Sequence, residues 1–358
     1  SMLKGTSKRT ASVIASEIES AGGSIDTYSG NNSFGLSLDI LSDDAALGQA
    51  VFLDVLLSPA FDSGEIERER TSQLAAIEQQ RDHLLSHTLK KLRSLIFGDT
   101  GYGLDSLGQA PVVTSLSREQ IAGHHSTFTS PANAVMAVFG DIDATQVRKQ
   151  IESALAQWDS PAPSVGLPEA SPLSETKRDS VSTEKEQAVV TLGFQGCTLG
   201  HADRYAMDLI SEALNDMGSR LFLKIREELG LAYYVGTQNF AGRIPGCFTF
   251  YAGTAAKSAA QVEEELTCQA KRLAKEGLTQ DELCRAKAKL TGHKKIARQD
   301  LGSVAFATCM DELLGLGYNH HAEEDIRIES VTIEQVRDVA NRYFGTEQFA
   351  TAVSLRSN

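Results

Sequence analysis

The sequence of 358 residues lacks features that would place it in several special classes of protein. No apolar run approaches the roughly 18 residues of a membrane-spanning helix, so the sequence predicts no membrane span. Basic residues are also fewer than acidic ones: the sequence has 34 lysines and arginines but 47 aspartates and glutamates. The resulting net charge of −13 repels phosphate backbones and anionic lipids. We therefore expect neither nucleic acid nor a membrane surface as a partner.

Cysteine is scarce and scattered. The five cysteines form no CxxC pair and all lie in the second half of the chain: Cys197, Cys247, Cys268, Cys284 and Cys309. This spacing predicts neither a disulfide framework nor a zinc knuckle. Lone cysteines are usually small buried hydrophobic residues, and that is the expectation here. The compartment stays open, because a bacterial cytoplasm and a periplasm fit the sequence equally well.

What the chain does have is length and an ordinary globular composition, with 41% hydrophobic and 23% charged residues. A chain of this length exceeds what one hydrophobic core usually serves, which favours two domains. A stretch rich in proline, serine and charge at 160–184 predicts a linker. It separates a first domain at 1–159 from a second domain at 185–358.

Hydrophobic periodicity and turn residues predict the elements of each half. In the first half we expect a helix at 10–21, strands at 24–30 and 33–41 joined as a hairpin, helices at 47–55, 66–95, 117–128 and 143–157, and a strand at 133–141. In the second half we expect strands at 187–194, 232–238, 244–254 and 348–355, and helices at 209–217, 218–228, 258–275, 279–296, 301–316 and 331–343.

The two halves also resemble one another in sequence. Residues 113–128 are similar to 328–344 at an offset of 215, and residues 61–70 are similar to 278–287. Two copies of one unit explain both likenesses. Strand pairs joined by tight turns, with helices between them, are typical of antiparallel sheets. The predicted fold class is α+β, with two homologous domains that each form a mostly antiparallel sheet covered by helices on one face.

Three stretches carry a resemblance to a known family. They are MLKGTSKRTASVIASEIESAGGSIDTYSG (2–30), SPAFDSGEIERER (58–70) and GSRLFLKIREELGLAYYV (218–235). The chain resembles the pitrilysin/insulinase-type metallopeptidases, the inverted zincins, over essentially its whole length. Members of this family bind zinc through an HxxEH helix and a glutamate on a second helix about 75 residues later. The two histidines hold the ion, the glutamate between them is the general base, and the distant glutamate completes the metal shell.

The chain departs from the family pattern at both parts of the zinc site. The HxxEH motif would immediately precede Met2, and the 358 residues contain no such motif. The third-ligand position, counted on from 67–70, falls on Ala76, which cannot bind zinc. Glu78 points to the opposite helix face, and Glu69 lies two turns away, roughly 10 Å along the axis. The resemblance therefore implies a non-catalytic member without a metal site, with zinc in a partner.

Other histidines invite a metal interpretation but have the wrong pattern. The groups are His83 with His87, His124 with His125, and His320 and His321 with Glu323, Glu324 and Asp325. The first pair has helical i, i+4 spacing but no glutamate between its members. The second pair points about 100° apart on a helix. The third group is expected to form a polar loop. None of them is expected to be a physiological metal site.

A second family feature is retained. In active members an arginine and a tyrosine in the pattern R-x(6)-Y contact the substrate or stabilise the oxyanion from the half opposite the zinc. The resemblance implies this role for Arg226 and Tyr233. From the residues alone, Gly230 would end a helix and Tyr233 would be a core strand residue. Tyr234 should point to the other strand face, so a shift of one residue would exchange the two tyrosines.

The leading hypothesis is a non-catalytic subunit or half of a zinc metallopeptidase. It would close a peptide-binding chamber against a zinc-bearing homologous subunit or N-terminal half and supply Arg226 and Tyr233; a homodimer is also possible. A complete first unit of this family carries roughly 50 more N-terminal residues, including a strand, so we expect the first sheet to be incomplete.

Two alternatives remain open. The chain resembles, in the same way, purely structural or peptide-binding homologues such as the core proteins of respiratory complexes. It could also belong to an active zinc protease whose HxxEH lies outside this sequence, which would need an acidic ligand in place of Ala76.

Overall fold

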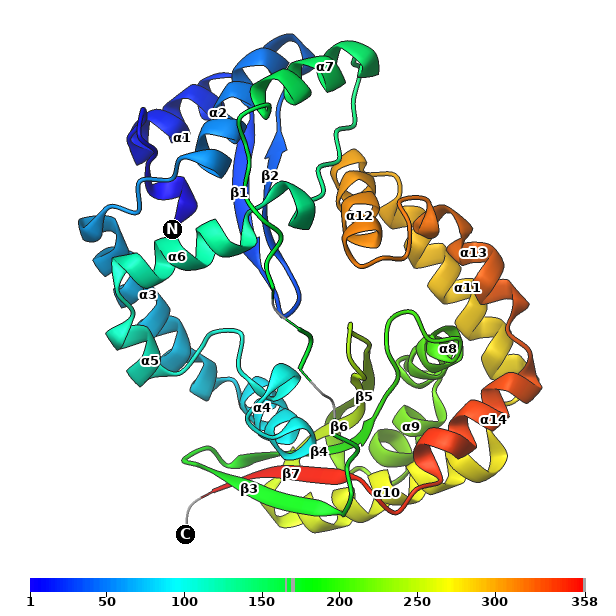
Figure 1. The fold of residues 1–358 in the computed structure, drawn as a ribbon. Helices are drawn as coiled ribbons and strands as arrows, with labels where there is room; N and C mark the ends of the chain where they lie inside the picture. The colour runs from blue at the N-terminus through cyan, green and yellow to red at the C-terminus, as the bar shows by residue number, and fades with distance from the viewer. Residues whose placement is uncertain (165, 169–170, 357–358) are drawn as a thin grey trace. The chain divides into compact units, whose positions relative to one another are not determined.

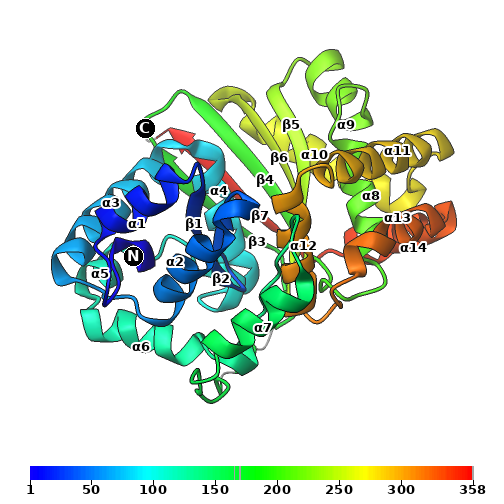
Figure 2. The same ribbon diagram turned by 90° about the horizontal axis from the view of Figure 1, so that it is seen from above.

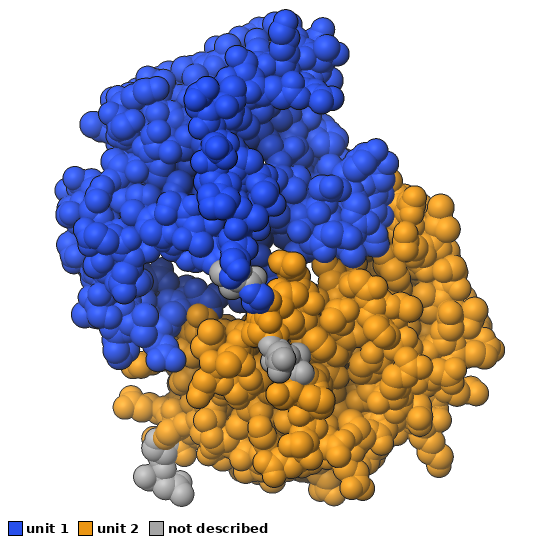
Figure 3. Space-filling model, viewed as in Figure 1, with its two compact units in different colours: residues 1–77, 106–166, 297–321 blue, residues 78–105, 167–296, 322–358 orange. Residues whose placement is uncertain are grey.

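The computed structural model describes residues 1–164, 166–168 and 171–356, and the chain forms two compact units (Figure 3). Unit 1 consists of Ser1–Ile77, Ser106–Gly166 and Ala297–His321. Unit 2 consists of Glu78–Asp105, Leu167–Ile296 and Ala322–Asn358. Both units therefore contain segments from each half of the sequence. Among the helices of the described part, none has the length and apolar character that a membrane crossing requires.

Unit 1 is built on an antiparallel hairpin in which β1 (Ser24–Ser29) pairs with β2 (Phe34–Asp39). Two helices, α1 (Ala11–Ser20) and α2 (Ala45–Leu57), lie beside the hairpin (Figure 2). Their buried side chains form the local core: Ile14, Ile18, Val51 and Val55. The expected first helix and hairpin are confirmed. Thr10 caps α1 by accepting a hydrogen bond from the backbone N–H of Val13, which satisfies one of the free donors of the first turn.

Five further α-helices of the described residues lie wholly or mostly in unit 1. They are α3 (Ser63–Asp82), α5 (Ala110–Ser115), α6 (Arg118–Phe128), α7 (Ala144–Ala154) and α12 (Leu301–Leu313). The single helix expected at 66–95 is wrong. It is broken at His83, whose ψ of 89° lies outside the helical region, and a separate helix α4 (Leu84–Phe97) follows in unit 2.

The strand expected at 133–141 is also wrong. Within the described residues, 134–139 form no helix and no ladder with another strand. Three of their side chains are 37–47% exposed: Met136, Val138 and Phe139. A strand exists only where a neighbouring backbone takes up its N–H and C=O groups, and no described segment does so here. In the described part of unit 1 the sheet consists of β1 and β2.

Unit 2 contains a five-stranded sheet in the order β3-β7-β4-β6-β5 (Figure 1). The strands are β3 (Lys177–Thr183), β4 (Gln187–Gln195), β5 (Ala232–Phe240), β6 (Cys247–Ala255) and β7 (Ala350–Arg356). Only the β3–β7 pair is parallel, so the predicted mostly antiparallel sheet is confirmed. β3 was not expected, because it lies inside the stretch whose composition indicated a linker.

Helices cover the sheet of unit 2 on both faces. On one face lie α8 (Arg204–Leu214), α10 (Ala259–Glu276) and α14 (Ile333–Phe344). They enclose buried residues of the sheet: Val190, Leu192, Phe248, Phe250 and Val353. The other face is covered by α4, through Leu92 and Ile96. The helix layer expected on one face is thus present, and α4 adds a second one.

The remaining helices of unit 2 are α9 (Arg220–Phe222), α11 (Gln280–Ala297) and α13 (His320–Ser330). α11 and α13 lie side by side (Figures 1 and 2), and Lys287 Nζ donates to the backbone oxygen of Glu329 at 2.6 Å. α14 and α6 begin alike: each has a capping box, formed by Thr332 with Gln335 and by Ser117 with Gln120. These equivalent caps lie 215 residues apart, as the repeat predicts.

Candidate functional site

The expected third-ligand position lies on α3, where Ala76 has no donor atom for a metal. The neighbouring carboxylates are already paired. The Glu69 carboxylate forms an ion pair with the ammonium of Lys4 at 3.4 Å. The Glu78 carboxylate forms one with the guanidinium of Arg81 at 3.0 Å. No three His, Cys, Asp or Glu side chains gather as a metal-binding group anywhere in the described parts of the chain. The residues present therefore do not fit the zinc ion that the family binds.

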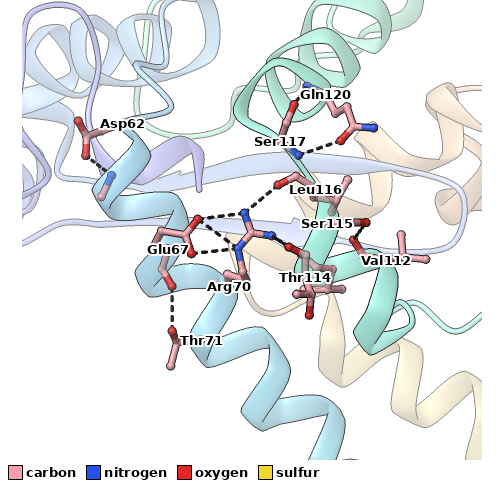
Figure 4. A network of polar contacts seen from close by, with 12 residues as sticks. Asp62, Glu67, Arg70, Thr71, Val112, Thr114, Ser115, Leu116, Ser117 and Gln120 are labelled. Carbon is pink, nitrogen blue, oxygen red and sulfur yellow. Dashed lines mark hydrogen bonds and ion pairs between the residues drawn. The ribbon is translucent and has the colours of Figure 1, made fainter.

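Arg70, in the ERER run just before Ala76, has a structural role (Figure 4). Its guanidinium donates to the Glu67 carboxylate, at 3.1 Å from Nη2 to Oε1. It also donates to backbone carbonyl oxygens in the last turn of α5 and at Leu116, just after that helix. The distances to the oxygens of Thr114 and Leu116 are 3.1 Å and 2.7 Å. The side chain thus holds the α5–α6 connection against α3. Sequence reasoning missed this role, since nothing in the ERER pattern shows which carbonyls lie nearby.

His83 and His87 do not form a ligand pair. His83 is the non-helical residue before α4, whereas His87 lies within the helix. Burial lowers the pKa of His87, and the positive charges of Lys90 and Arg81 lower it further. The same two cations would repel a divalent metal ion.

The other two histidine groups are used for packing and ion pairing. The His124 ring lies 4.6 Å from the Phe128 ring, and His125 Nε2 is 3.0 Å from the backbone oxygen of Leu56. The polar loop expected around His320 and His321 is wrong, because these residues open helix α13. Within it, Glu324 is paired with Lys294 at 2.7 Å and with Arg204 at 3.2 Å.

Arg226 lies in a helical irregularity of unit 2. Leu223–Glu228 form a π-helical turn directly after α9, and such turns occur frequently at functional sites. The buried Ile225 anchors the turn, and Gly230 at φ 60° ends it, as its position in the sequence predicts. The Arg226 side chain is 46% exposed, and its guanidinium carbon lies 5.0 Å from the centre of the Phe222 ring. The ring supports the guanidinium from one side, and the Arg226 Nε lies 4.0 Å from the Glu227 carboxylate.

Tyr233 lies in a second irregularity, a bulge near the start of β5. Ala232 pairs with Thr254 and Tyr234 with Gly253 on β6, so Tyr233 is the extra residue without a partner. Bulges interrupt the alternation of side chains and re-aim them. Tyr233 is 56% exposed and Tyr234 is 37% exposed, so Tyr233 is not the core residue that strand propensity alone would favour.

Tyr234 packs across the sheet while Tyr233 does not. Its ring lies over Gly253, where a Cβ would collide with it, and its centre is 6.3 Å from that of Tyr251. Burial raises the pKa of both Tyr234 and Tyr251, so both phenols stay protonated at neutral pH. The two adjacent tyrosines therefore occupy different environments, one packed and one projecting.

The two predicted residues come from elements that pack together, since the π-helical turn adjoins β5. β5 is an edge strand of its sheet. The Arg226 guanidinium and the Tyr233 hydroxyl are both hydrogen-bond donors, of the kind that can bind a carbonyl oxygen or an oxyanion.

Helices packed on a mostly antiparallel sheet, together with equivalent capping boxes 215 residues apart, define an α+β protein with an internal repeat. Residues 1–109 match the family described as "Insulinase (Peptidase family M16)", and residues 115–290 match "Peptidase M16 inactive domain". The chain belongs to peptidase family M16, the insulinase family.

Relatives and solved structures agree with this membership. An uncharacterized zinc protease of Bacillus subtilis is 26% identical over 355 residues, which are 98% of this chain and 85% of that protein. One of Streptomyces coelicolor is 29% identical, with 96% and 76% covered. A peptidase M16 inactive domain from Pseudomonas fluorescens has a TM-score of 0.87 at 19% identity, with 100% and 86% covered. A protease from Helicobacter pylori has a TM-score of 0.86 at 17% identity, with 99% and 86% covered.

Proposed function

We propose that this chain is a non-catalytic subunit or half of a family M16 zinc metallopeptidase, and that it supplies Arg226 and Tyr233 to a peptide held against a zinc-bearing partner. The observation that carries the proposal is the pairing of two exposed donors, each placed by a local irregularity, with a third-ligand position occupied by Ala76. Both donors project from these irregularities toward solvent, with Arg226 46% and Tyr233 56% exposed, which supports a role in binding.

The chemistry of Arg226 and Tyr233 suits a peptide whose scissile carbonyl is being hydrolysed. Arginine stays charged at every physiological pH, and its forked donors match carbonyl or carboxylate oxygens. Removing one donor that stabilises an oxyanion costs about 10²–10³ in kcat in well-studied hydrolases. The donors would act on negative charge that develops at the scissile carbonyl. Water activation would fall to the partner, because the described residues hold no zinc ligand set.

The partner we propose is a homologous subunit or an N-terminal half that carries HxxEH and its third glutamate. The substrate class is a peptide or small protein in extended conformation, the form that pairs with an edge strand such as β5. Such pairing would use backbone groups other than those of Thr237, which Asn215 already binds. A homodimer of this chain would lack a zinc site at both sides, so it would bind peptide without cleaving it.

The test uses a zinc-bearing M16 homologue from the same genome, mixed with this chain, and a quenched fluorescent peptide library as substrate. We expect cleavage by the mixture and none by this chain alone. Arg226→Ala or Tyr233→Phe should lower kcat of the mixture by about 10–10³-fold while binding of the two proteins persists.

Matched variants separate this role from general damage. Arg243→Ala removes another exposed arginine of unit 2, and Tyr318→Phe removes the hydroxyl of another exposed tyrosine. Both should leave the rate unchanged. Tyr234→Phe tests the neighbouring tyrosine directly.

Two results would contradict the proposal. Full activity of the Arg226→Ala and Tyr233→Phe mixtures would favour a purely structural homologue. One zinc per chain after dialysis of this protein alone, together with cleavage of the library, would show an autonomous protease instead.

A further inference from the structure

The edge of β5 is closed at one point by a side chain of the same unit. Asn215, directly after α8, forms two hydrogen bonds with the backbone of Thr237. Its Nδ2 donates to the Thr237 oxygen at 2.7 Å, and its Oδ1 accepts from the Thr237 N–H at 2.7 Å. A residue of a neighbouring antiparallel strand would make the same two bonds. At Thr237 the side chain therefore occupies the place of a further strand.

Contacts on both sides hold Asn215 in this position. Residue 236 is a glycine, and a Cβ there would lie 2.6 Å from Asn215 Oδ1. The Asn215 amide also donates to Ser211 Oγ at 3.3 Å, and Ser211 Oγ is 3.2 Å from Thr237 Oγ1. The backbone oxygen of Asn215 accepts from Lys289 Nζ of α11 at 3.3 Å. The closure is therefore a fixed part of unit 2.

One face of α8 is bound to the second part of β5. Asp208, Ser211 and Asn215 follow one another at spacings of three and four residues, which places them on the same side of the helix. Asp208 Oδ1 accepts from Asn239 Nδ2 at 2.8 Å, while Ser211 and Asn215 contact Thr237. These hydrogen bonds hold β5 from Thr237 to Asn239.

The first part of β5 has a boundary at its start as well. Leu231, the residue before the strand, donates its backbone N–H to the oxygen of Ile225 in the π-helical turn at 2.9 Å. Residues 232–236 lie between this bond and Thr237, and they include the bulge at the exposed Tyr233. The π-helical turn beside this stretch carries Arg226.

We infer that Asn215 is a stop on the edge of β5, which limits pairing with an extended peptide to residues 232–236. This role rests on the proposed function, because it presupposes a peptide beside Arg226 and Tyr233. A paired strand lies about 4.8 Å from its neighbour, and at Thr237 that place is taken by the Asn215 amide. The peptide must leave the edge before Thr237, which keeps its paired segment beside Arg226 and Tyr233.

Peptide binding to the full chain alone tests the stop. The probe is a short fluorescein-labelled peptide of alternating threonine and lysine. Its Kd is measured by fluorescence anisotropy in about 0.15 M salt, which screens long-range charge attraction. Asn215→Ala leaves the Thr237 N–H and C=O to the peptide. It should lower the Kd at least about threefold, because a longer segment pairs and two further hydrogen bonds form.

Two controls accompany this measurement. Asn341→Ala removes another exposed carboxamide, which donates to the backbone oxygen of Ala274 on α10, and it should leave the Kd unchanged. A probe methylated at every peptide nitrogen cannot pair as a strand, so it should not distinguish Asn215→Ala from the parent chain. Equal Kd values for the parent and Asn215→Ala with the unmethylated probe would overturn the stop. A gain that the methylated probe shows too, or no binding of the unmethylated probe to Asn215→Ala, would overturn it as well.

Hydrogen exchange of the unmodified chain gives a second measurement, which serves if Asn215→Ala loses its circular dichroism spectrum. With saturating probe, we expect slower exchange of amides within 232–236 and unchanged exchange at 237–240. Protection in neither segment, or protection that extends through 237–240, would overturn the stop.

Failure of the stop and failure of the proposed function give different results. Full activity of the Arg226→Ala and Tyr233→Phe mixtures would overturn the proposed function. Equal peptide binding by the parent chain and Asn215→Ala, with cleavage still dependent on Arg226 and Tyr233, would overturn only the role of Asn215.

Discussion

At the scale of single residues, Ala76 of α3 carries only a methyl group and offers no atom to a metal ion. The family resemblance leads us to expect a carboxylate ligand at this position. Glu69 and Glu78 of the same helix are paired with Lys4 and Arg81. We propose that this alanine removes the third ligand of the family's zinc site from α3.

The cysteines provide a prediction at this scale. Burial raises the pKa of Cys197 to about 11 and also raises that of Cys247, whereas Cys268 and Cys284 are exposed. The thiolate is the reactive form, so a raised pKa means slower reaction at pH 8. With Ellman's reagent we expect Cys268 and Cys284 to react quickly, and Cys197 and Cys247 only after unfolding.

A Cys268→Ser, Cys284→Ser double variant is the control, because it should abolish the fast phase. A fast phase that survives in this variant would show that Cys197, Cys247 or the half-buried Cys309, whose pKa burial also raises, reacts without unfolding.

Leu92 tests how firmly one side chain of α4 is packed. It is completely buried between the helix and the sheet. Leu92→Ala should lower the free energy of unfolding by about 2–5 kcal/mol, through lost burial and the cavity left behind. Urea titration followed by circular dichroism measures this change. Leu104→Ala, at a side chain 52% exposed in the same unit, should change it by less than about 0.5 kcal/mol.

At the scale of elements, an ion pair joins α9 to the first turn of α11. Arg220 Nε donates to Glu282 at 2.7 Å, and the backbone N–H of Thr279 donates to the same carboxylate at 2.8 Å. Burial alone would raise the pKa of Glu282, but the hydrogen bonds from Arg220 and Thr279 outweigh it and hold the pKa below the ordinary value of 4.5. The charged carboxylate therefore stabilises the fold.

The direction of this pKa shift fixes how the stability contributed by Glu282 depends on pH. A lowered pKa contributes stability above the unfolded-state value, and the contribution is lost as the pH falls through the folded-state value. Glu282→Gln should cost about 1–3 kcal/mol at pH 7, measured by urea unfolding. The difference from the parent protein should shrink as the pH falls below 4.5.

Glu276→Gln is the matched control, since Glu276 pairs with Arg272 on the surface of one helix. Its effect at pH 7 should be small. A Glu282→Gln penalty that stays constant down to acid pH would contradict the assigned cause.

At the scale of the whole molecule, equivalent segments of the two repeats differ in strand pairing and burial. At the offset of 215, residues 135–139 correspond to 350–354 of β7, which pair with β3 and β4 and are buried. We expect the amides of 135–139 to exchange with deuterium within seconds and those of 350–354 to be protected by orders of magnitude. Hydrogen exchange with mass spectrometry measures both segments in one experiment. Equal protection would mean that 135–139 pair with another strand in solution.

The sequence alone determined the features that depend on near neighbours. Helix caps such as Ser117 with Gln120, the hairpin of β1 and β2, the apolar faces of the helices and the alanine at position 76 follow from residues a few positions apart. Short-range hydrogen bonds and helical or strand periodicity fix them whatever the rest of the chain does. The fold class and the family resemblance follow from the same local patterns, repeated twice.

Only the tertiary structure decided what depends on distant segments. It determined that α4 separates from α3 and covers the sheet of the other half, that 134–139 find no strand partner among the described residues, and that His320 and His321 begin a helix. It also placed Arg226 on a π-helical turn and Tyr233 on a bulge, which no local pattern indicated. Strand pairing, burial and register are settled by which backbone and side chains meet across the fold, and that information lies in contacts hundreds of residues apart.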